Sequence, residues 1–276
     1  MAQLLGLTIL SFFITMILLI PFLDFLYKIK LRRVKQVTRD PFNKRTPVFD
    51  KYHEWKVGTP IGGGILIIGV VSILTFWAYG IFDSPVKPWE LFVIFFSFLS
   101  FGALGLYDDI KKMVDYKSAT FFGLRLRHKL IIQIVLAGII ASVFYFQLGY
   151  NFIYLPGLNL IPIGILFIPF ATFIIVSFVN AVNIADGLDG LASGLFLICL
   201  IAFLTIASQQ IEGSLGIFIA IMIGAMLAFL YFNIYKARIW LGDVGALSLG
   251  AMLAVIGLLT GKTFSLAVIG GVFLVE

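Results

Sequence analysis

Residues 91–112 read LFVIFFSFLSFGALGLYDDIKK, an apolar run that closes on two aspartates and two lysines. The hydrocarbon core of a bilayer is about 30 Å thick, so a helix that spans it needs ~20 mostly apolar residues. The apolar run from about 89 to 107 meets this requirement. The stretch therefore predicts a membrane-spanning helix whose polar end carries Asp108 and Asp109.

Runs of the same kind recur along the whole chain. Of its 276 residues, 61% are hydrophobic and 12% are charged, whereas soluble domains are about 25% charged. The other apolar runs lie near 4–26, 60–82, 130–149, 159–179, 190–208, 215–235 and 244–260, and a ninth begins at Phe264. We expect an all-α, polytopic integral membrane protein with eight full transmembrane helices plus the start of a ninth, folded as a single domain over 1–276.

The basic residues indicate the orientation. Four segments share one side of the membrane if the N-terminus lies outside, and three of them hold all of the 20 Lys and Arg residues except Lys87 and Lys262. Those segments are 27–59, 108–129, 180–189 and 236–243. Because Lys and Arg accumulate in cytoplasmic loops, we expect these segments to be cytosolic. They include a basic loop at 28–58.

This orientation brings the acidic side chains to one membrane face. Asp108 and Asp109 end one span, and Lys112 follows them. The pair could be a solvated helix end with an ion pair, which contributes only about 0.3–0.5 kcal/mol. Adjacent aspartates also repel each other unless a cation lies between them. Mg²⁺ is a natural candidate, since it is commonly held by one or two carboxylates plus substrate phosphates.

A second polar stretch, NAVNIADGLDGLASG, occupies 180–194. Asn180, Asn183, Asp186 and Asp189 recur every third residue, so on a helix they form a row that winds slowly around it. The glycines beside them would let a ligand or another helix approach closely. The alternative is a loop in which Asp186 or Asp189 caps the next helix.

Two further stretches carry polar residues to the same face. In FNIYKARIWLGDVGALSLG (232–250), Asp243 directly precedes an apolar span and could be a simple N-cap. Trp240 is either an interfacial tryptophan or a flat surface for a nucleobase. In HEWKVGTPIGGG (53–64), three consecutive glycines weaken a helix, and close packing or ligand access explains them better than helix propensity does.

With GLRLRHKL (123–130), these motifs together make the chain resemble the polyprenyl-phosphate N-acetylhexosamine-1-phosphate transferases. The resemblance runs from about residue 50 to the end of the chain. The GTPxxGG and NxxDGLDGLA forms favour the phospho-N-acetylmuramoyl-pentapeptide transferase branch. The resemblance implies about ten spans, with a histidine-rich cytosolic motif between the last two. Because the run FSLAVIGGVFLV is only twelve residues long, we expect the sequence to be truncated at the C-terminus.

The resemblance also implies a reaction. Undecaprenyl phosphate and UDP-N-acetylmuramoyl-pentapeptide would give lipid I and UMP, at the cytosolic face of the bacterial inner membrane, with Mg²⁺ as cofactor. A homodimer is compatible with it, and no nucleic-acid partner is expected. The alternatives are a UDP-N-acetylglucosamine or hexosamine-1-phosphate transferase for surface glycans, a transporter, which would place its acids nearer the bilayer midplane, and a non-catalytic membrane scaffold.

Roles for individual residues follow from the same resemblance. Asp243 is the leading Mg²⁺ ligand, with Asp108 and Asp109 close by, and one of the latter two orients or deprotonates the lipid phosphate. Phosphate oxygens are implied to contact Lys112 and Lys129. The nucleoside side is implied to comprise Asn183, Asp186, Asp189 and the backbone of Gly187 and Leu188, with Trp240 near the uracil and with Asn233 and Thr59 as further substrate contacts.

Overall fold

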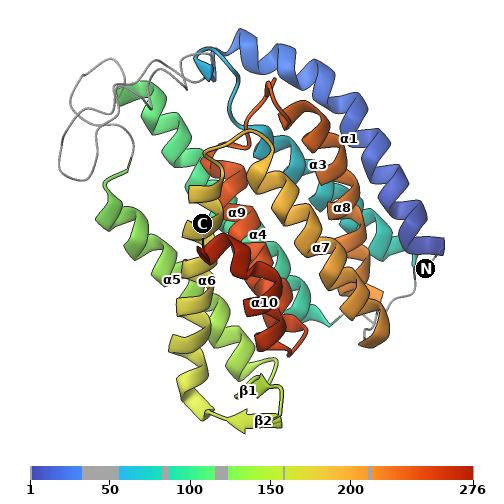
Figure 1. Ribbon diagram of the computed structural model, residues 1–276, viewed down its shortest axis with the longest axis vertical. Coiled ribbons are helices and arrows are strands. Elements are labelled where there is room, and N and C mark those ends of the chain that lie inside the picture. The colour runs from blue at the N-terminus through green and yellow to red at the C-terminus, as the bar shows by residue number, and fades with distance from the viewer. Residues whose placement is uncertain are drawn as a thin grey trace.

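The computed structural model describes residues 2–32, 56–82, 87–115, 124–157, 159–210 and 213–275 (Figure 1). Its helices are α1 Ala2–Lys28, α3 Gly63–Ile81, α4 Pro88–Asp115, α5 Leu126–Phe146, α6 Phe167–Ala185, α7 Leu191–Gln210, α8 Gly213–Asn233, α9 Gly242–Leu259 and α10 Thr263–Val275. Seven helices in this part of the chain are long and apolar enough to cross a membrane, and 191–206 and 263–275 form shorter apolar helices. The expectation of an all-α, multi-pass membrane protein is confirmed. Most of the basic loop predicted at 28–58 lies outside the described residues.

One apolar run folds differently from the expectation. The run near 159–179 was expected to be helical throughout, but its first residues form strand β2 (Asn159–Pro162), which pairs antiparallel with β1 (Phe152–Leu155). The sequence Pro156-Gly157 makes the turn between them, with a positive φ of 88° at Gly157. Helix α6 begins only at Phe167, after a short 3₁₀ turn at Gly164–Leu166. Hydropathy alone predicts one span over this run, but the Pro156-Gly157 turn pairs its first residues with β1 as a strand.

Helix α9 lies at the centre of the bundle. Every residue from Val244 to Leu258 is buried, and α3, α4 and α6 pack around it. Glycines permit this packing: a Cβ on Gly105 of α4 would collide with the carbonyl oxygen of Asp243, and one on Gly64 would collide with the backbone of Gly245. The glycines of the GTPIGGG stretch thus serve close helix packing, as one of the two explanations above supposed.

The polar ends of the helices meet at one end of the bundle. The C-terminal ends of α4, α6 and α8 and the N-terminal ends of α5, α7 and α9 lie at the upper end in Figure 1, opposite the β1–β2 hairpin. The acids and lysines singled out above all lie at these ends or in the turns that join them. The alternation of helix directions brings them together although they are far apart in the sequence.

Candidate active site

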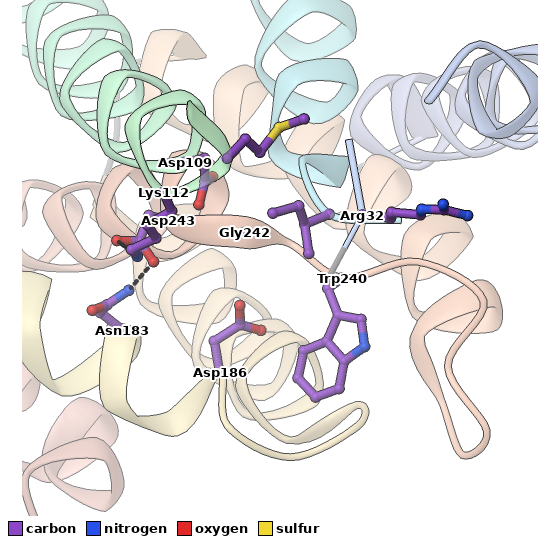
Figure 2. Close-up of a pocket in the computed structure, with 10 residues that line it drawn as sticks. Arg32, Asp109, Lys112, Asn183, Asp186, Trp240, Gly242 and Asp243 are labelled. Atoms are coloured by element: carbon purple, nitrogen blue, oxygen red, sulfur yellow. Dashed lines mark hydrogen bonds and ion pairs between the residues drawn. The ribbon is translucent and has the colours of Figure 1, made fainter. Parts of the chain in front are cut away.

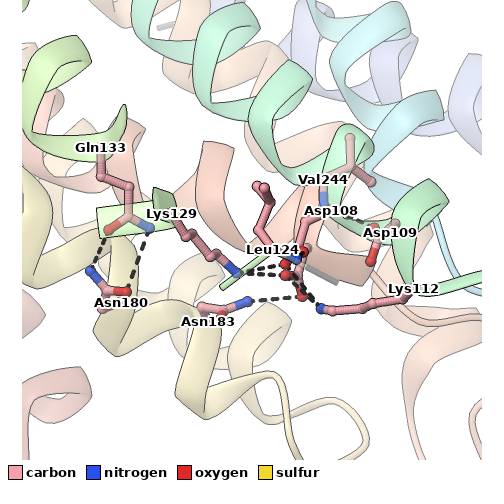
Figure 3. A network of polar contacts seen from close by, with 10 residues as sticks. Asp108, Asp109, Lys112, Leu124, Lys129, Gln133, Asn180, Asn183 and Val244 are labelled. Carbon is pink, nitrogen blue, oxygen red and sulfur yellow. Dashed lines mark hydrogen bonds and ion pairs between the residues drawn. The ribbon is translucent and has the colours of Figure 1, made fainter. Parts of the chain in front are cut away.

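Two lysines bridge two aspartates at the polar end of the bundle (Figure 3). The Oδ2 atom of Asp108, on α4, lies 3.2 Å from Lys112 Nζ and 3.1 Å from Lys129 Nζ. The Oδ2 atom of Asp243, on α9, lies 2.8 Å from Lys112 Nζ and 2.6 Å from Lys129 Nζ. Since Lys129 belongs to α5, this ion network joins three helices.

Backbone and amide donors fix the carboxylates further. Leu124 N–H donates to Asp108 Oδ1 (2.7 Å), and Asn183 Nδ2 donates to Asp243 Oδ1 (3.3 Å). Asp109 Oδ2 accepts from Val244 N–H (3.1 Å) in the first turn of α9, where a negative charge is favoured by the unpaired N–H groups and the helix dipole. Asp243 itself is the second residue of α9 and points to the lysines, so it is not the N-cap that one interpretation made it.

The network places three carboxyl groups beside two ammonium groups, and most of it is buried. Asp108 is 2% exposed, Asp109 is 3% exposed and Lys129 is 9% exposed. Buried charges are stable only when they are paired. Lys112 and Lys129 pair with Asp108 and Asp243, whereas Asp109 accepts from the Val244 N–H. A cation bound here would give the third carboxyl group a partner of opposite charge.

The donor chemistry fits a hard divalent cation that shares its coordination with a substrate. The site offers carboxylate oxygens, which are ligands that Mg²⁺ prefers, and Mg²⁺ commonly takes only one or two protein carboxylates besides phosphate oxygens and water. Among the described residues, no three His, Cys, Asp or Glu side chains are close enough to hold a metal ion together. The protein residues thus suit an ion completed by phosphates rather than an all-protein cage.

A pocket of about 240 Å³ opens beside the network (Figure 2). Asp109, Lys112 and Asp243 lie on one side of it, and Asp186 and the indole ring of Trp240 lie on another. The complete lining is Arg32, Ile61, Asp109, Lys112, Met113, Asn183, Asp186, Trp240, Gly242 and Asp243. Charged groups next to an aromatic residue suit a ligand that carries both phosphates and a flat ring, although Trp240 itself is only 2% exposed.

A second group of contacts joins three turns next to this pocket. Lys56 is 2% exposed, and its Nζ donates to the Gly187 carbonyl oxygen (2.9 Å). The same atom lies 4.5 Å from the centre of the Trp240 ring and 3.9 Å from Asp189 Oδ1. Asp189 Oδ2 accepts from Ala237 N–H (3.1 Å). Lys56 thereby ties the 186–190 turn to the segment that carries Trp240.

Asn233 connects the same turns from the opposite side. Its Oδ1 accepts from Gly190 N–H (3.2 Å) and from Ser193 Oγ (2.6 Å), and its Nδ2 donates to the Ile239 carbonyl oxygen (2.9 Å). Asn233 is 1% exposed. Its contacts within the described residues are therefore with the protein framework.

The structure sorts the predicted site residues into two groups. Asp109, Lys112, Asn183, Asp186, Trp240 and Asp243 line the pocket, and Asp108 and Lys129 complete the ion network behind it. Thr59, Gly187, Leu188, Asp189 and Asn233 do not line this pocket. A direct substrate contact for the second group stays a prediction.

The row of polar residues at every third position does not stay on one helix. Helix α6 ends at Ala185, so only Asn180 and Asn183 are helical, and Asp186 and Asp189 lie in the following turn. Asn183 faces Asp243, Asp186 lines the pocket and Asp189 faces Ala237. The regularly spaced polar side chains therefore contact different parts of the protein and do not form one continuous row.

Sequence reasoning missed two cationic residues. Lys56 and Arg32 were counted only as part of a basic loop, yet Lys56 is buried between turns and Arg32 lines the pocket. Lys56 precedes the Thr59-Pro60 motif by three residues, and that proximity was the one signal available. Nothing in the sequence distinguishes Arg32 from its basic neighbours.

The sequence of this chain is similar to those of known proteins. A model of glycosyl transferase family 4 matches residues 91–261. A phospho-N-acetylmuramoyl-pentapeptide-transferase of Aquifex aeolicus (strain VF5) is 34% identical over 97% of this chain and 75% of its own length. Those of Bacillus pumilus (strain SAFR-032) and Bacillus subtilis (strain 168) are 39% and 37% identical, over 81% and 82% of this chain and 68% of their own lengths. The resemblance predicted from the motifs is confirmed: the chain belongs to glycosyl transferase family 4 and, within it, to the phospho-N-acetylmuramoyl-pentapeptide-transferases.

Proposed function

We propose that this enzyme transfers phospho-N-acetylmuramoyl-pentapeptide from its UDP-linked precursor to undecaprenyl phosphate, giving lipid I and UMP. The observation that carries the proposal is the Asp108–Lys112–Lys129–Asp243 network beside a pocket with an aromatic side. The names of the relatives support the same reaction. The position of the network at one end of the bundle suits a lipid phosphate that lies at headgroup level.

We place this end at the cytosolic face of the bacterial inner membrane. The distribution of the basic residues supports the assignment, because every Lys and Arg except Lys87 and Lys262 falls in segments on this side. A UDP-linked donor is a soluble, multiply charged molecule, so the site must face the compartment that supplies it. In this orientation the N-terminus of α1 lies outside.

Phosphoryl transfer depends mainly on positioning and on charge stabilisation. In the proposed reaction an oxygen of the lipid phosphate attacks the sugar-linked phosphorus, and the bond from that phosphorus to the UMP oxygen breaks. Lys112 and Lys129 hold phosphate oxygens, and Asp108 or Asp109 orients the acceptor. A phosphate monoester has a second pKa of about 6, so the acceptor is largely dianionic at neutral pH and needs no strong base. This favours direct attack over a covalent aspartyl intermediate.

Residues on the other side of the pocket would take the nucleoside. Asn183 and Asp186 offer polar atoms. Trp240 also lines the pocket, but it is only 2% exposed and Lys56 Nζ lies over its ring, so a base that stacks on this ring has to displace that contact. Thr59, Asp189, Asn233 and the Gly187–Leu188 backbone hold or adjoin the turns that shape this side. Their proposed contribution to binding is therefore at least partly indirect.

We propose Mg²⁺ as the cofactor, with Asp243 as its leading ligand and Asp108 and Asp109 beside it. When bound, Mg²⁺ neutralises charge on the pyrophosphate oxygens and thereby stabilises the leaving UMP. The grouping of three carboxyl groups beside two lysines supports this assignment.

The test is release of UMP by the Asp243→Asn variant. The amide keeps the shape of the side chain but removes the charge, so we expect UMP release to fall below a tenth of the wild-type rate while the protein stays folded. Glu90→Gln is the matched control, because Glu90 lies in the first turn of α4 and pairs with Lys87 away from the site. Release above a tenth would contradict the assigned role of Asp243. Robust exchange of UMP into the UDP-linked donor without lipid would instead support a covalent intermediate.

A further inference from the structure

A pair of amide side chains lies one helical turn deeper in the bundle than the ion network (Figure 3). Asn180 Nδ2 donates to Gln133 Oε1 (2.8 Å), and Gln133 Nε2 donates to Asn180 Oδ1 (3.5 Å). Gln133 belongs to α5 and is fully buried, at 0% exposure. Asn180 belongs to α6, and its Nδ2 also donates to the Val176 carbonyl oxygen (2.8 Å).

This pairing is directional. A buried amide that finds no partner loses its hydrogen bonds to water without replacement, which is costly inside a bilayer. The two amides satisfy each other only when α5 and α6 have one particular rotation and one particular axial register. Apolar contacts between the same helices would tolerate small slides, because packing attraction has little directionality. The pair therefore selects one arrangement of two apolar helices.

The selected arrangement bears on the ion network. Lys129 precedes Gln133 by one turn of α5, and Asn183 follows Asn180 by one turn of α6, so each pair shares a helix face. Lys129 Nζ donates to Asp108 Oδ2 (3.1 Å) and Asp243 Oδ2 (2.6 Å), and Asn183 Nδ2 donates to Asp243 Oδ1 (3.3 Å). A one-residue slide of α5 would move Lys129 by about 1.5 Å, more than such contacts allow.

We propose that Gln133 and Asn180 are positioning residues, which set the register of α5 on α6 and so hold Lys129 and Asn183 against Asp243. Neither amide lines the pocket, and the role assigned to them here requires no contact with substrate. The activity readout of this proposal rests on the proposed function. The reactivity of Lys129 provides a second readout that does not.

The decisive variant is the double substitution Gln133→Met with Asn180→Leu. Asn180→Leu alone leaves the buried Gln133 amide without its partner, and Gln133→Met alone leaves Asn180 with only the bond to the Val176 carbonyl of its own helix among the bonds described above, so a loss of folding in either single variant would be uninformative. The double change removes both amides and keeps apolar volume, so thermal stability is expected to stay near that of the wild type. Without the directional pair, we expect kcat to fall by about tenfold to a hundredfold, since a 1 Å misplacement can cost a hundredfold, with KM for the UDP-linked donor changed far less. Wild-type kcat in this folded double variant would overturn the proposal.

The second readout is acylation of the Lys129 amine in the folded protein in detergent, followed by proteolysis and mass spectrometry of the peptides. Lys129 is buried and ion-paired in the wild type, so we expect slow labelling there and labelling at least about fivefold faster in the double variant, as for a group released from a closed arrangement. Lys111, which does not line the pocket, serves as the internal reference. Unchanged Lys129 labelling would also overturn the proposal. If the wild type released no UMP, the proposed function would fail, and the labelling would still decide this inference.

Gln133→Asn keeps a buried amide but retracts it by one methylene, and it serves if the double variant does not fold. We expect it to fold with lowered kcat and faster Lys129 labelling, and wild-type values of both would contradict the inference. Ser142→Ala on α5 and Thr172→Val on α6 are the matched controls. Each removes a hydroxyl that bonds only to a carbonyl of its own helix, so neither is expected to change kcat or labelling.

Discussion

The two sides of the pocket are built in different ways. The phosphate side consists of charged side chains on α4, α5 and α9 that pair directly with one another. The side proposed to take the nucleoside consists of turns at 56–61, 186–190 and 234–241, which are tied together by side chains that bond to backbone carbonyl and N–H groups. Helices thus position the groups assigned to the chemistry, and turns shape the surface assigned to recognition.

This difference has a kinetic consequence. A substitution in the ion network removes interactions that strengthen as charge moves in the transition state, so it is expected to lower kcat. A substitution in the turns removes interactions made equally in the bound substrate, so it is expected to raise KM. The predictions that follow test this division, beginning with the largest effect.

Lys129→Met is expected to have the largest effect. It removes a cation that lies within 3.1 Å of the buried Asp108 carboxylate and of the partly buried Asp243 carboxylate. We expect kcat to fall by about 10²–10³-fold, the range for removing one preorganised donor from a site of developing charge. The thermal midpoint should also fall, because breaking a buried ion pair costs about 3–5 kcal/mol. UMP release and thermal unfolding in detergent are the measurements.

A double variant separates the two consequences of Lys129→Met. Adding Asp108→Asn removes the carboxylate that Lys129 leaves undercompensated, so stability should recover in part while activity stays low. Recovery of activity together with stability would mean that Lys129 serves folding only.

Gly105→Ala tests how closely α4 must approach α9. A Cβ at this position would collide with the Asp243 carbonyl oxygen, so the helices must separate and the Asp108 and Asp243 side chains move apart. Overpacking of a tight core contact costs about 1–3 kcal/mol, and we expect kcat to fall by about tenfold to a hundredfold through the displaced network. Gly138→Ala on α5 is the control, because a Cβ there meets nothing within 4 Å. Equal behaviour of the two variants would show that the close approach is unimportant.

Lys56→Met tests the turn side. It removes the bond to the Gly187 carbonyl and the cation over the Trp240 ring while keeping an unbranched apolar side chain. Hydrogen bonds from charged groups contribute about 1.5–3 kcal/mol, so we expect KM for the UDP-linked donor to rise by about tenfold or more, with kcat changed less than threefold. A fall in kcat with KM unchanged would contradict the assignment of kcat effects to the ion network and KM effects to the turns. Lys30→Met, at an exposed position after α1, is the matched control.

The sequence predicted the helices of this fold better than its turns. Hydropathy located each apolar run, and the basic residues indicated that the Asp108, Asp186 and Asp243 regions share one end. The β1–β2 hairpin was missed because its residues are as apolar as a membrane span. The turn after Ala185 was left open as an alternative to a continuous helix, because a three-residue spacing does not reveal where a helix stops.

The sequence did not predict which side chains of the site contact one another. Lys129 and Asp243 are 114 residues apart, and no local pattern shows that their side chains meet. Lys56 was hidden for the same reason, since its role depends on where Gly187 and Trp240 lie in space. Composition and periodicity indicate at which membrane face a residue lies. The side chains that it contacts depend on how the helices and turns pack in space.

Trp240→Phe is expected to have the smallest effect and therefore tests the division most finely. The backbone of Trp240 is fixed independently of its ring, because its N–H donates to the Pro60 carbonyl (2.9 Å) and its carbonyl accepts from Gly63 N–H (2.9 Å). A side-chain change thus probes the ring alone. Stacking of a base on an aromatic ring contributes about 1–3 kcal/mol; Phe retains a ring, so KM should rise less than about threefold, whereas Trp240→Ala should raise it by about tenfold.

The matched control for this series is Trp77→Phe, a half-exposed tryptophan of α3 that does not line the pocket. Steady-state kinetics of UMP release at varied donor concentration distinguishes the outcomes. If Trp240→Ala left KM unchanged, the ring would be a packing partner of Lys56 rather than a surface for the base. The nucleoside side would then have to be assigned to Asn183 and Asp186 alone, on the same helix and turn that already contact Asp243.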